Sequence, residues 1–188
     1  RSGKTSPRGE GLRHARWRYR VLPIQRMSDL RIGYGEDIHR LVPNRKLILG
    51  GVEIPFNQGL LGHSDADCLL HAIADALLGA CALGDIGDHF PVDDPQWENA
   101  DSKKILSESY SLVKKKGYQI TNLDASVLAE KPRLSPYRLA MRESIARVLE
   151  LDLNQVSVKL MTNEGLDAIG KGKAIRSTCI CLLERKTL

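Results

Sequence analysis

The sequence lacks any long hydrophobic run. Of its 188 residues 42% are hydrophobic, yet the longest apolar stretches, Cys68–Leu70 and Ile73–Leu78, are interrupted by His71 and Asp75. A membrane-spanning helix needs about 20 consecutive apolar residues, and a secretory signal needs an apolar core that the amino terminus does not have. No internal repeat, collagen period or coiled-coil heptad is present. The length and composition predict one soluble globular domain with a core of its own.

Cysteine is also scarce. The four cysteines, at positions 68, 81, 179 and 181, form no CxxC pair. Cys179 and Cys181 lie two apart in a β-like run and so share a face. Buried free thiols are therefore expected, and nothing in the spacing indicates an oxidising compartment.

Excess positive charge is confined to the amino terminus. The net charge is +5, but residues 1–30 hold eight of the 28 basic residues and only two of the 23 acidic ones. That segment carries +6 and the remaining 158 residues carry −1. No nucleic-acid partner is expected for residues 31–188, because a basic surface is the electrostatic requirement for such binding.

Residues 1–29 are interpreted as a disordered basic leader, and residues 30–188 as the folded domain. The leader is rich in Arg, Gly and Ser and has no apolar periodicity. Met27 would be a natural start, so the leader is a tag, an upstream extension or a transit-like peptide. The protein would be cytoplasmic if bacterial, and would enter a plastid-type organelle if the leader is a transit peptide.

The apolar patterns predict an α/β fold, an α+β sandwich in which helices cover a mixed sheet. Gly50 and Gly51 favour a hairpin, Ser64 or Asp65 is expected to cap the first helix, and Pro136 opens the third. Strands are predicted at 30–38, 46–49, 52–54, 118–129, 156–161 and 174–183, helices at 64–80, 101–116 and 135–149, and a loop at 85–95.

Asp37 and His39 are the first candidate metal ligands. Residues two apart on a strand point the same way, so a carboxylate and an imidazole share one face there. Taken alone, the pair is also compatible with an ordinary surface position.

The first helix carries a second polar feature. Asp67, His71 and Asp75 are spaced by four and so form one stripe on an otherwise apolar helix. Buried groups of this kind need a partner or a cation. The stripe fits Asp–His hydrogen bonds, and equally His71 as a metal ligand supported by the carboxylates.

Asp37, His39 and His71 together offer nitrogen and oxygen ligands without a thiolate. Three such ligands suit Zn²⁺ in a catalytic site, where the fourth position is left for substrate. The polar loop at 85–91 could bind a polyol, and Thr162 with Glu164 could seat phosphates and Mg²⁺; each also fits a plain turn or strand end. His63-Ser64-Asp65 is not a hydrolytic triad, because triad members converge from separate elements.

From Arg31 to about Glu184 the chain resembles the 2-C-methyl-D-erythritol 2,4-cyclodiphosphate synthases of the non-mevalonate isoprenoid pathway. The resemblance rests on motifs whose order and spacing match throughout. These motifs are Gly33-Tyr-Gly-Glu-Asp-Ile-His39, Gly62-His-Ser-Asp-Ala-Asp67, His71-Ala-Ile-Ala-Asp-Ala-Leu-Leu-Gly79, Leu83-Gly-Asp-Ile-Gly-Asp-His-Phe-Pro91 and Thr162-Asn-Glu-Gly165.

The resemblance implies roles for individual residues. Asp37, His39 and His71 match zinc ligands, and Glu164 matches the residue near a second ion, Mg²⁺ or Mn²⁺. His63 and Thr162 match residues credited with transition-state stabilisation. Substrate contacts are implied at Ser64, Asp85, Ile86, Gly87, Phe90, Pro91, Val92, Asp93, Asp94, Ala129, Glu130, Lys131, Pro132, Arg133, Leu134, Ser135, Met161, Asn163, Ala168 and Lys171, with residues 129–135 at the cytosine.

The implied reaction converts 4-CDP-2-C-methyl-D-erythritol 2-phosphate to the cyclic diphosphate and releases CMP. The implied assembly is a homotrimer with active sites between subunits. The same ligands would also serve a zinc phosphohydrolase, and a nucleotide-binding module without catalysis is a third possibility. Glu36, Val92, Glu130, Met161, Ala168 and Lys171 depart from the family pattern, but none of them is a zinc-ligand position.

Overall fold

The computed structural model describes residues 29–186, so the leader predicted for the amino terminus lies, apart from Asp29, outside the described residues. Asp29 belongs to the folded body. Its carboxylate accepts hydrogen bonds from the Tyr118 hydroxyl at 2.8 Å and from the Arg185 guanidinium at 2.7 Å. Asp29, predicted to be the last residue of the leader, therefore lies with the folded residues.

Strands and helices alternate irregularly along the chain. The strands are β1 (Leu30–Pro43), β2 (Leu47–Leu49), β3 (Val52–Ile54), β4 (Gln58–Leu60), β5 (Tyr118–Leu128), β6 (Val156–Met161) and β7 (Ala174–Arg185). The α-helices are α1 (Cys68–Ala80), α2 (Ile86–His89), α3 (Ser102–Lys115), α4 (Arg138–Leu149) and α5 (Asp167–Gly170). Short 3-10 turns occupy Pro95–Trp97, Ser135–Tyr137 and Leu153–Gln155.

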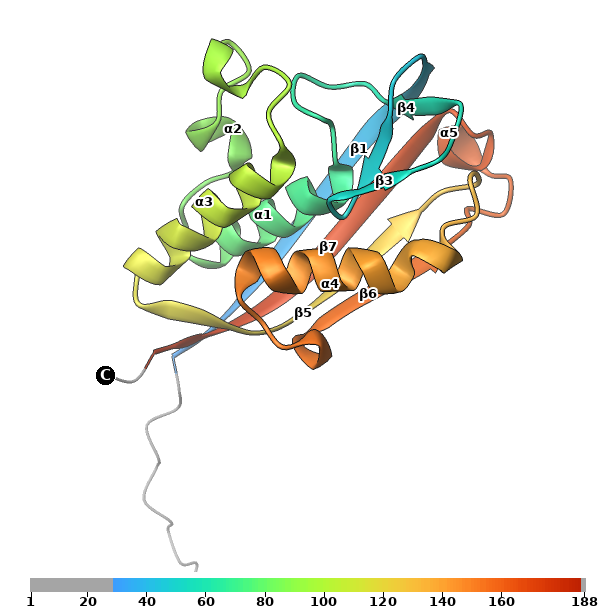
Figure 1. Ribbon diagram of the computed structural model, residues 1–188. Coiled ribbons are helices and arrows are strands. Elements are labelled where there is room, and N and C mark those ends of the chain that lie inside the picture. Colours follow the sequence, from blue (N-terminus) through green and yellow to red (C-terminus); the bar gives the residue numbers. More distant parts are fainter. Residues whose placement is uncertain (1–28, 187–188) are drawn as a thin grey trace, which may run out of the picture.

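The main sheet has five strands in the order β4-β1-β7-β5-β6. β1 and β7, from opposite ends of the chain, run antiparallel from Leu30 opposite Glu184 to Arg40 opposite Ala174 (Figure 1). β5 pairs antiparallel with β7 and parallel with β6, so the sheet is mixed. The mixed α/β fold predicted from the sequence is confirmed.

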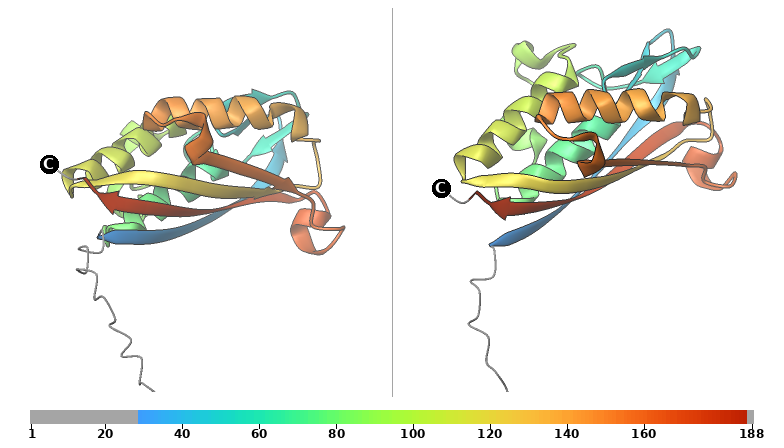
Figure 2. Two further views of the ribbon diagram at one scale, coloured as in Figure 1. Left: turned by 90° about the horizontal axis from the view of Figure 1, so that it is seen from below. Right: turned by 60° about the horizontal axis from the view of Figure 1, so that its bottom comes forward.

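Helices α1, α3 and α4 cover one face of the sheet (Figure 2). Nearly every residue of α1 is buried, because apolar side chains surround this helix and it lies between the sheet and α3. None of the helices described between residues 29 and 186 is long and apolar enough to cross a membrane.

The opposite face of the sheet carries a patch of exposed apolar side chains. Ile32 and Tyr34 on β1 expose 75% and 58% of their surface, and Ile180, which pairs with Tyr34 across the sheet, exposes 55%. Contiguous exposed apolar side chains commonly mark a protein interface. This face is therefore a candidate surface for association with another chain.

Two glycines let α1 lie directly against β1. A Cβ atom added at Gly35 would lie 2.6 Å from the backbone nitrogen of Ala76 and closer still to the carbonyl oxygen of Ala72. At Gly33 an added Cβ would lie 2.8 Å from the carbonyl carbon of Ala76. Only glycine fits at this contact, and the contact brings His71 of the helix next to the strand.

The first helix begins later than predicted, at Cys68, because Asp67 rather than Ser64 or Asp65 is its cap. The predicted hairpin joins β2 to β3 through Gly50 and Gly51, both with positive φ, and presents two backbone N–H groups to the Asp67 carboxylate at 3.0 and 2.6 Å. Asp67 also accepts from the first turn of α1 and is fully buried. Burial raises the pKa of Asp67.

Two further expectations need correction, and one strand was missed. The 85–95 segment is not a plain loop, since it contains α2 and the start of a 3-10 turn at Pro95–Trp97. The third helix begins at Arg138, after a 3-10 turn at the predicted start. The short strand β4 was not predicted, and it extends the sheet beside the carboxyl end of β1.

All four cysteines are free thiols, as predicted. Cys68, Cys179 and Cys181 are buried and Cys81 is half-buried. Burial raises the pKa of Cys181 to about 12. These thiols are therefore packing residues of the core rather than nucleophiles.

Candidate active site

The candidate metal ligands of β1 lie on the covered side of the sheet. Burial alternates along this strand, with Gly33, Gly35, Asp37, His39 and Leu41 toward the helices and the residues between them exposed. Asp37 and His39 therefore share one face, as their spacing predicts. Each side chain is about one-fifth exposed.

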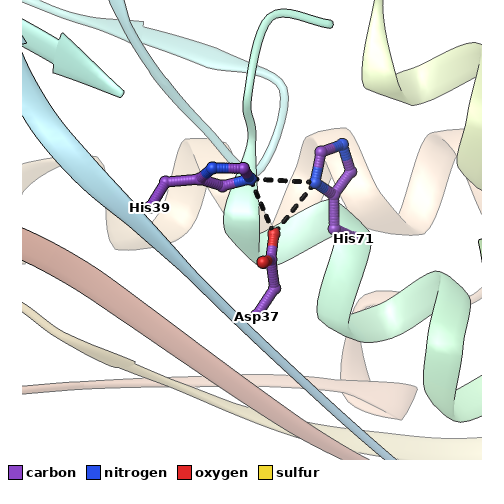
Figure 3. Close-up of side chains that lie close together, drawn as sticks. All are labelled: Asp37, His39 and His71. Atoms are coloured by element: carbon purple, nitrogen blue, oxygen red, sulfur yellow. Dashed lines mark hydrogen bonds and ion pairs between the residues drawn. The ribbon is translucent and has the colours of Figure 1, made fainter. Parts of the chain in front are cut away.

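His71 of α1 completes the cluster (Figure 3). Its Nδ1 lies 2.9 Å from Asp37 Oδ2 and 3.4 Å from His39 Nε2, and His39 Nε2 lies 3.0 Å from the same carboxylate oxygen. His71 is buried. The packing of α1 on the glycines of β1 thus brings together the three residues that the sequence proposes as ligands.

This donor set fits a zinc ion. Tetrahedral zinc with bonds of about 2.0–2.1 Å holds its ligand atoms about 3.3 Å apart, and the separations in the cluster are 2.9–3.4 Å. His39 Nδ1 lies 2.7 Å from the Leu61 carbonyl oxygen, which accepts its N–H and leaves the Nε2 lone pair for a metal. The ligand atoms of these three residues lie close enough together for one metal ion to contact all of them.

Electrostatics within the cluster favour an ionised Asp37. Burial acts to raise the pKa of Asp37, but hydrogen bonds with His39 and His71 outweigh it and lower that pKa well below its usual range. Burial acts to lower the pKa of His39, whereas the neighbouring Asp37 carboxylate raises it overall. Asp37 is therefore anionic at neutral pH, as a metal ligand must be.

A cavity of about 180 Å³ opens beside the cluster. His63 lines it, and its Nε2 is buried without a hydrogen-bond partner among the described residues. The other lining residues are the three candidate ligands, Ser64, Ile86, Gly87, Phe90, Val92, Trp97 and Ile105. The sequence analysis did not predict Trp97 or Ile105 as site residues. Trp97 closely follows the predicted substrate segment, but no local sequence signal indicates that its side chain lines the cavity.

The polar stripe predicted on α1 divides into three roles. His71 joins the metal cluster, Asp67 caps the helix, and Asp75 accepts the Ile86 backbone N–H at 2.8 Å. Neither carboxylate hydrogen-bonds to His71, so the interpretation that they support this ligand is wrong. Asp75 instead anchors α2, which brings Ile86 and Gly87 to the cavity. Burial raises the pKa of Asp75.

Four predicted substrate residues do not line this cavity. Asp85 caps α2, where its carboxylate accepts the Asp88 backbone N–H at 3.2 Å. Asp94 caps the 3-10 turn that follows by accepting from Gln96 N at 3.0 Å. Pro91 and Asp93 lie in the segment between these caps.

The predicted nucleotide segment forms a separate cavity of about 530 Å³. Its lining includes every residue of that segment, Ala129, Glu130, Lys131, Pro132, Arg133, Leu134 and Ser135, together with Met161, proposed as a substrate contact, and Thr162, proposed for transition-state stabilisation. Phe56, Arg138 and Leu160 complete it and were missed. Arg138 could have been suspected, because it is a cation in the first turn after Ser135.

Thr162 and Glu164 lie at the end of β6, where the Thr162 hydroxyl donates to the Glu164 carboxylate. Asn163 instead donates to the Leu166 carbonyl oxygen at 3.0 Å. Ala168 belongs to α5 and lines a third cavity of about 620 Å³ beside Ile38 and Arg40, and exposed Lys171 caps α5. Within one chain, none of these residues lines the cavity of the metal cluster.

The fold and the site define a mixed α/β protein with a candidate three-ligand metal centre beside a small, partly apolar cavity. The chain belongs to the YgbB family, which matches residues 30–184. It is 56% identical over 154 residues to the 2-C-methyl-D-erythritol 2,4-cyclodiphosphate synthase of Clostridium perfringens, a match that covers 82% of this chain and 99% of that protein.

Solved structures agree in fold. A CDP-bound 2C-methyl-D-erythritol-2,4-cyclodiphosphate synthase is 39% identical, with a TM-score of 0.77 over 82% of this chain and all of the other. The bifunctional IspDF of Campylobacter jejuni is 37% identical with a TM-score of 0.81. There the match covers 84% of this chain but 43% of that longer one.

Proposed function

We propose that the chain converts 4-CDP-2-C-methyl-D-erythritol 2-phosphate to 2-C-methyl-D-erythritol 2,4-cyclodiphosphate with release of CMP, a phosphorus–oxygen lyase reaction of isoprenoid precursor biosynthesis. The observation that carries this proposal is the cluster of Asp37, His39 and His71 beside a cavity lined by His63 and Ser64, in a chain 56% identical to a protein of that name.

Two metal ions belong to the proposal. Asp37, His39 and His71 would hold Zn²⁺, and Glu164 would lie at Mg²⁺ or Mn²⁺, which prefer carboxylate oxygens. Bound there, the ions would withdraw charge from the phosphate oxygens of the CDP group. The chain's remaining task is to orient the two reacting groups and to exclude competing nucleophiles.

The 2-phosphate of the substrate is the nucleophile and attacks the β-phosphorus, so that CMP leaves with the electron pair of the broken P–O bond. The 2-phosphate is already anionic at neutral pH, and the protein needs no strong base. His63 Nε2, which is buried and has no hydrogen-bond partner within residues 29–186, would hydrogen-bond to a phosphate oxygen, and Thr162 would do the same from its own strand end.

The two cavities suit different halves of such a substrate. The apolar wall of Phe90, Val92 and Trp97 would pack against the carbon skeleton, beside the backbone of Gly87. The larger cavity offers Lys131, Arg133 and Arg138 to an anionic nucleotide. Their different polarities support a substrate with a branched polyol at one end and a cytidine phosphate at the other.

The separation of the two cavities within one chain supports a homotrimer with active sites between subunits. The two cavities share no lining residue within one chain, so a single substrate would reach both most simply across a subunit boundary. The exposed apolar face around Ile32, Tyr34 and Ile180 provides a surface for that assembly.

A zinc phosphohydrolase would use the same ligands, and only the attacking oxygen separates it from the cyclase. A tethered 2-phosphate has a large effective concentration, worth about 7–11 kcal/mol in well-oriented cases, and should outcompete water. The test is to incubate the chain with the CDP substrate in ¹⁸O-water and to analyse the products by mass spectrometry.

The cyclase predicts a cyclic diphosphate and CMP without label, and no turnover of an analogue that lacks the 2-phosphate. One ¹⁸O atom on phosphorus per turnover, together with cleavage of that analogue, would replace the proposal with a hydrolase. Metal binding without any turnover would indicate a nucleotide-binding module. The His71→Ala variant is the matched control for contaminating activity.

A further inference from the structure

Both ring nitrogens of His71 have side-chain partners, one on the metal side and one on the opposite side of the ring. Its Nδ1 faces Asp37, and its other ring nitrogen, Nε2, lies 2.9 Å from the Ser102 hydroxyl at the start of α3. The Ser102 hydroxyl in turn contacts the Asp65 carboxylate. Neither Ser102 nor Asp65 is among the residues that the sequence singles out for chemistry.

The direction of these hydrogen bonds follows from the groups themselves. An ionised carboxylate only accepts, so the Ser102 O–H donates to Asp65. The oxygen of Ser102 then has a lone pair left for His71, and it accepts the Nε2–H. A neutral imidazole with its hydrogen on Nε2 keeps the Nδ1 lone pair free, and Nδ1 is the atom that faces Asp37 and His39.

Asp65 is fixed firmly enough to impose this direction. It accepts the Ser102 backbone N–H at 3.1 Å as well as the hydroxyl, and it accepts the Asp67 backbone N–H at 3.2 Å. Ser102 is fully buried, so water does not compete for its hydroxyl. These hydrogen bonds therefore link the loop before α1 to α3 and to α1, and all of them donate in the direction from His71 through Ser102 to Asp65.

We propose that Ser102 and Asp65 are positioning residues that fix the tautomer and ring orientation of His71 and so raise the affinity of the site for zinc. The inference rests on the proposed metal centre. Outer partners of metal-bound histidines typically contribute 10–100-fold to metal affinity. Ser64 also lies 3.2 Å from Nε2, so we expect removal of the Ser102 hydroxyl alone to cost about tenfold.

α3 itself provides a matched control. Ser109 is also fully buried, but its hydroxyl donates to the Ile105 carbonyl oxygen of its own helix at 2.9 Å. Ser102→Ala and Ser109→Ala therefore remove the same atom from the same helix at a comparable depth. Only the first removes a partner of His71.

The experiment measures zinc affinity of the full chain by competition with a chromophoric chelator, with melting temperature recorded for each variant. We expect about tenfold weaker zinc binding in Ser102→Ala and a change within about twofold in Ser109→Ala. The visible spectrum of the Co²⁺-substituted protein should shift in Ser102→Ala alone, because that spectrum reports ligand geometry.

Asp65 is tested in the Ser102→Ala background. If Asp65 acts through Ser102, adding Asp65→Asn should weaken zinc binding by no more than about twofold further. If Asp65→Asn instead weakens zinc binding further by a factor that multiplies the loss in Ser102→Ala, Asp65 does not act through Ser102 and is removed from the proposal. Equal zinc affinity and equal Co²⁺ spectra in Ser102→Ala and Ser109→Ala would overturn it altogether.

The zinc measurements on the wild-type chain distinguish failure of this inference from failure of the proposed function. A wild-type chain that binds no zinc would overturn the metal centre and this inference together. A wild-type chain that binds zinc and cyclises its substrate, with Ser102→Ala equal to it in zinc affinity, would overturn this inference alone.

Discussion

Replacement of Gly35 by alanine tests whether the packing of α1 on β1 builds the candidate metal centre. The added Cβ would lie 2.6 Å from Ala76 N, whereas comfortable van der Waals contact needs about 3.5 Å. The helix must therefore move by about 1 Å. His71 immediately precedes Ala72, whose carbonyl oxygen lies closest to the added atom, so the shift reaches this ligand directly.

Two magnitudes follow from this displacement. Overpacking a close contact typically lowers the free energy of unfolding by about 1–3 kcal/mol, which for a domain of this size is a fall in melting temperature of roughly 2–12 °C. Metal sites tolerate errors of only about 0.2 Å in ligand distance, so zinc affinity should fall by at least about tenfold.

The assay is a thermal melt together with chelator competition for zinc, and Gly79→Ala is the control. Gly79 lies in the same helix, is exposed, and an added Cβ would have its nearest contact at 3.9 Å. Alanine there should be neutral or stabilise by up to about 1 kcal/mol. If Gly35→Ala behaves like Gly79→Ala in both measurements, the close contact does not position the ligands.

Four further predictions follow from the site and the sheet. His71→Ala should remain folded by circular dichroism but lose most bound zinc and most activity; full zinc retention by metal analysis would refute its role as a ligand. Glu164→Gln should raise the Mg²⁺ or Mn²⁺ concentration for half-maximal rate without changing zinc content, since the amide loses the anionic oxygen; an unchanged titration would show a structural role. A chain starting at Asp29 should match the full chain in melting temperature and activity, and a large loss of either would show that residues 1–28 pack on the body. Light scattering should give the mass of a trimer, and Ile32→Asp should reduce it because a charge in an apolar interface is costly; a fully active monomer would exclude the assembly.

Most of the strands and the pair of residues on β1 were accessible from the sequence because they depend on neighbouring residues only, whereas β4 was missed and β1 extends beyond its predicted end to Pro43. Asp37 and His39 share a face because successive side chains of a strand alternate. The predicted boundaries of β6, Val156–Met161, agree with the structure because the strand is a short run between clear turns. The family motifs carried the rest of the functional prediction.

The cap of α1 shows where this reasoning fails. Ser64, Asp65 and Asp67 are all good capping residues by type, and the sequence favoured the first two. The structure selects Asp67 because Gly50 and Gly51, 17 and 16 residues earlier in the chain, direct two N–H groups at its carboxylate. Ser64 and Asp65 are thereby left for the surroundings of His71.

The sequence by itself determined the longer strands and helices and which residues offer metal ligands. Only the tertiary structure decided that His71 meets Asp37, 34 residues away, and that Ser102, 31 residues away on another helix, holds its far side. Periodicity is fixed by the geometry of adjacent peptide units. A contact between distant side chains depends on how closely two elements pack, and here that distance is set by two glycines that leave room for a helix.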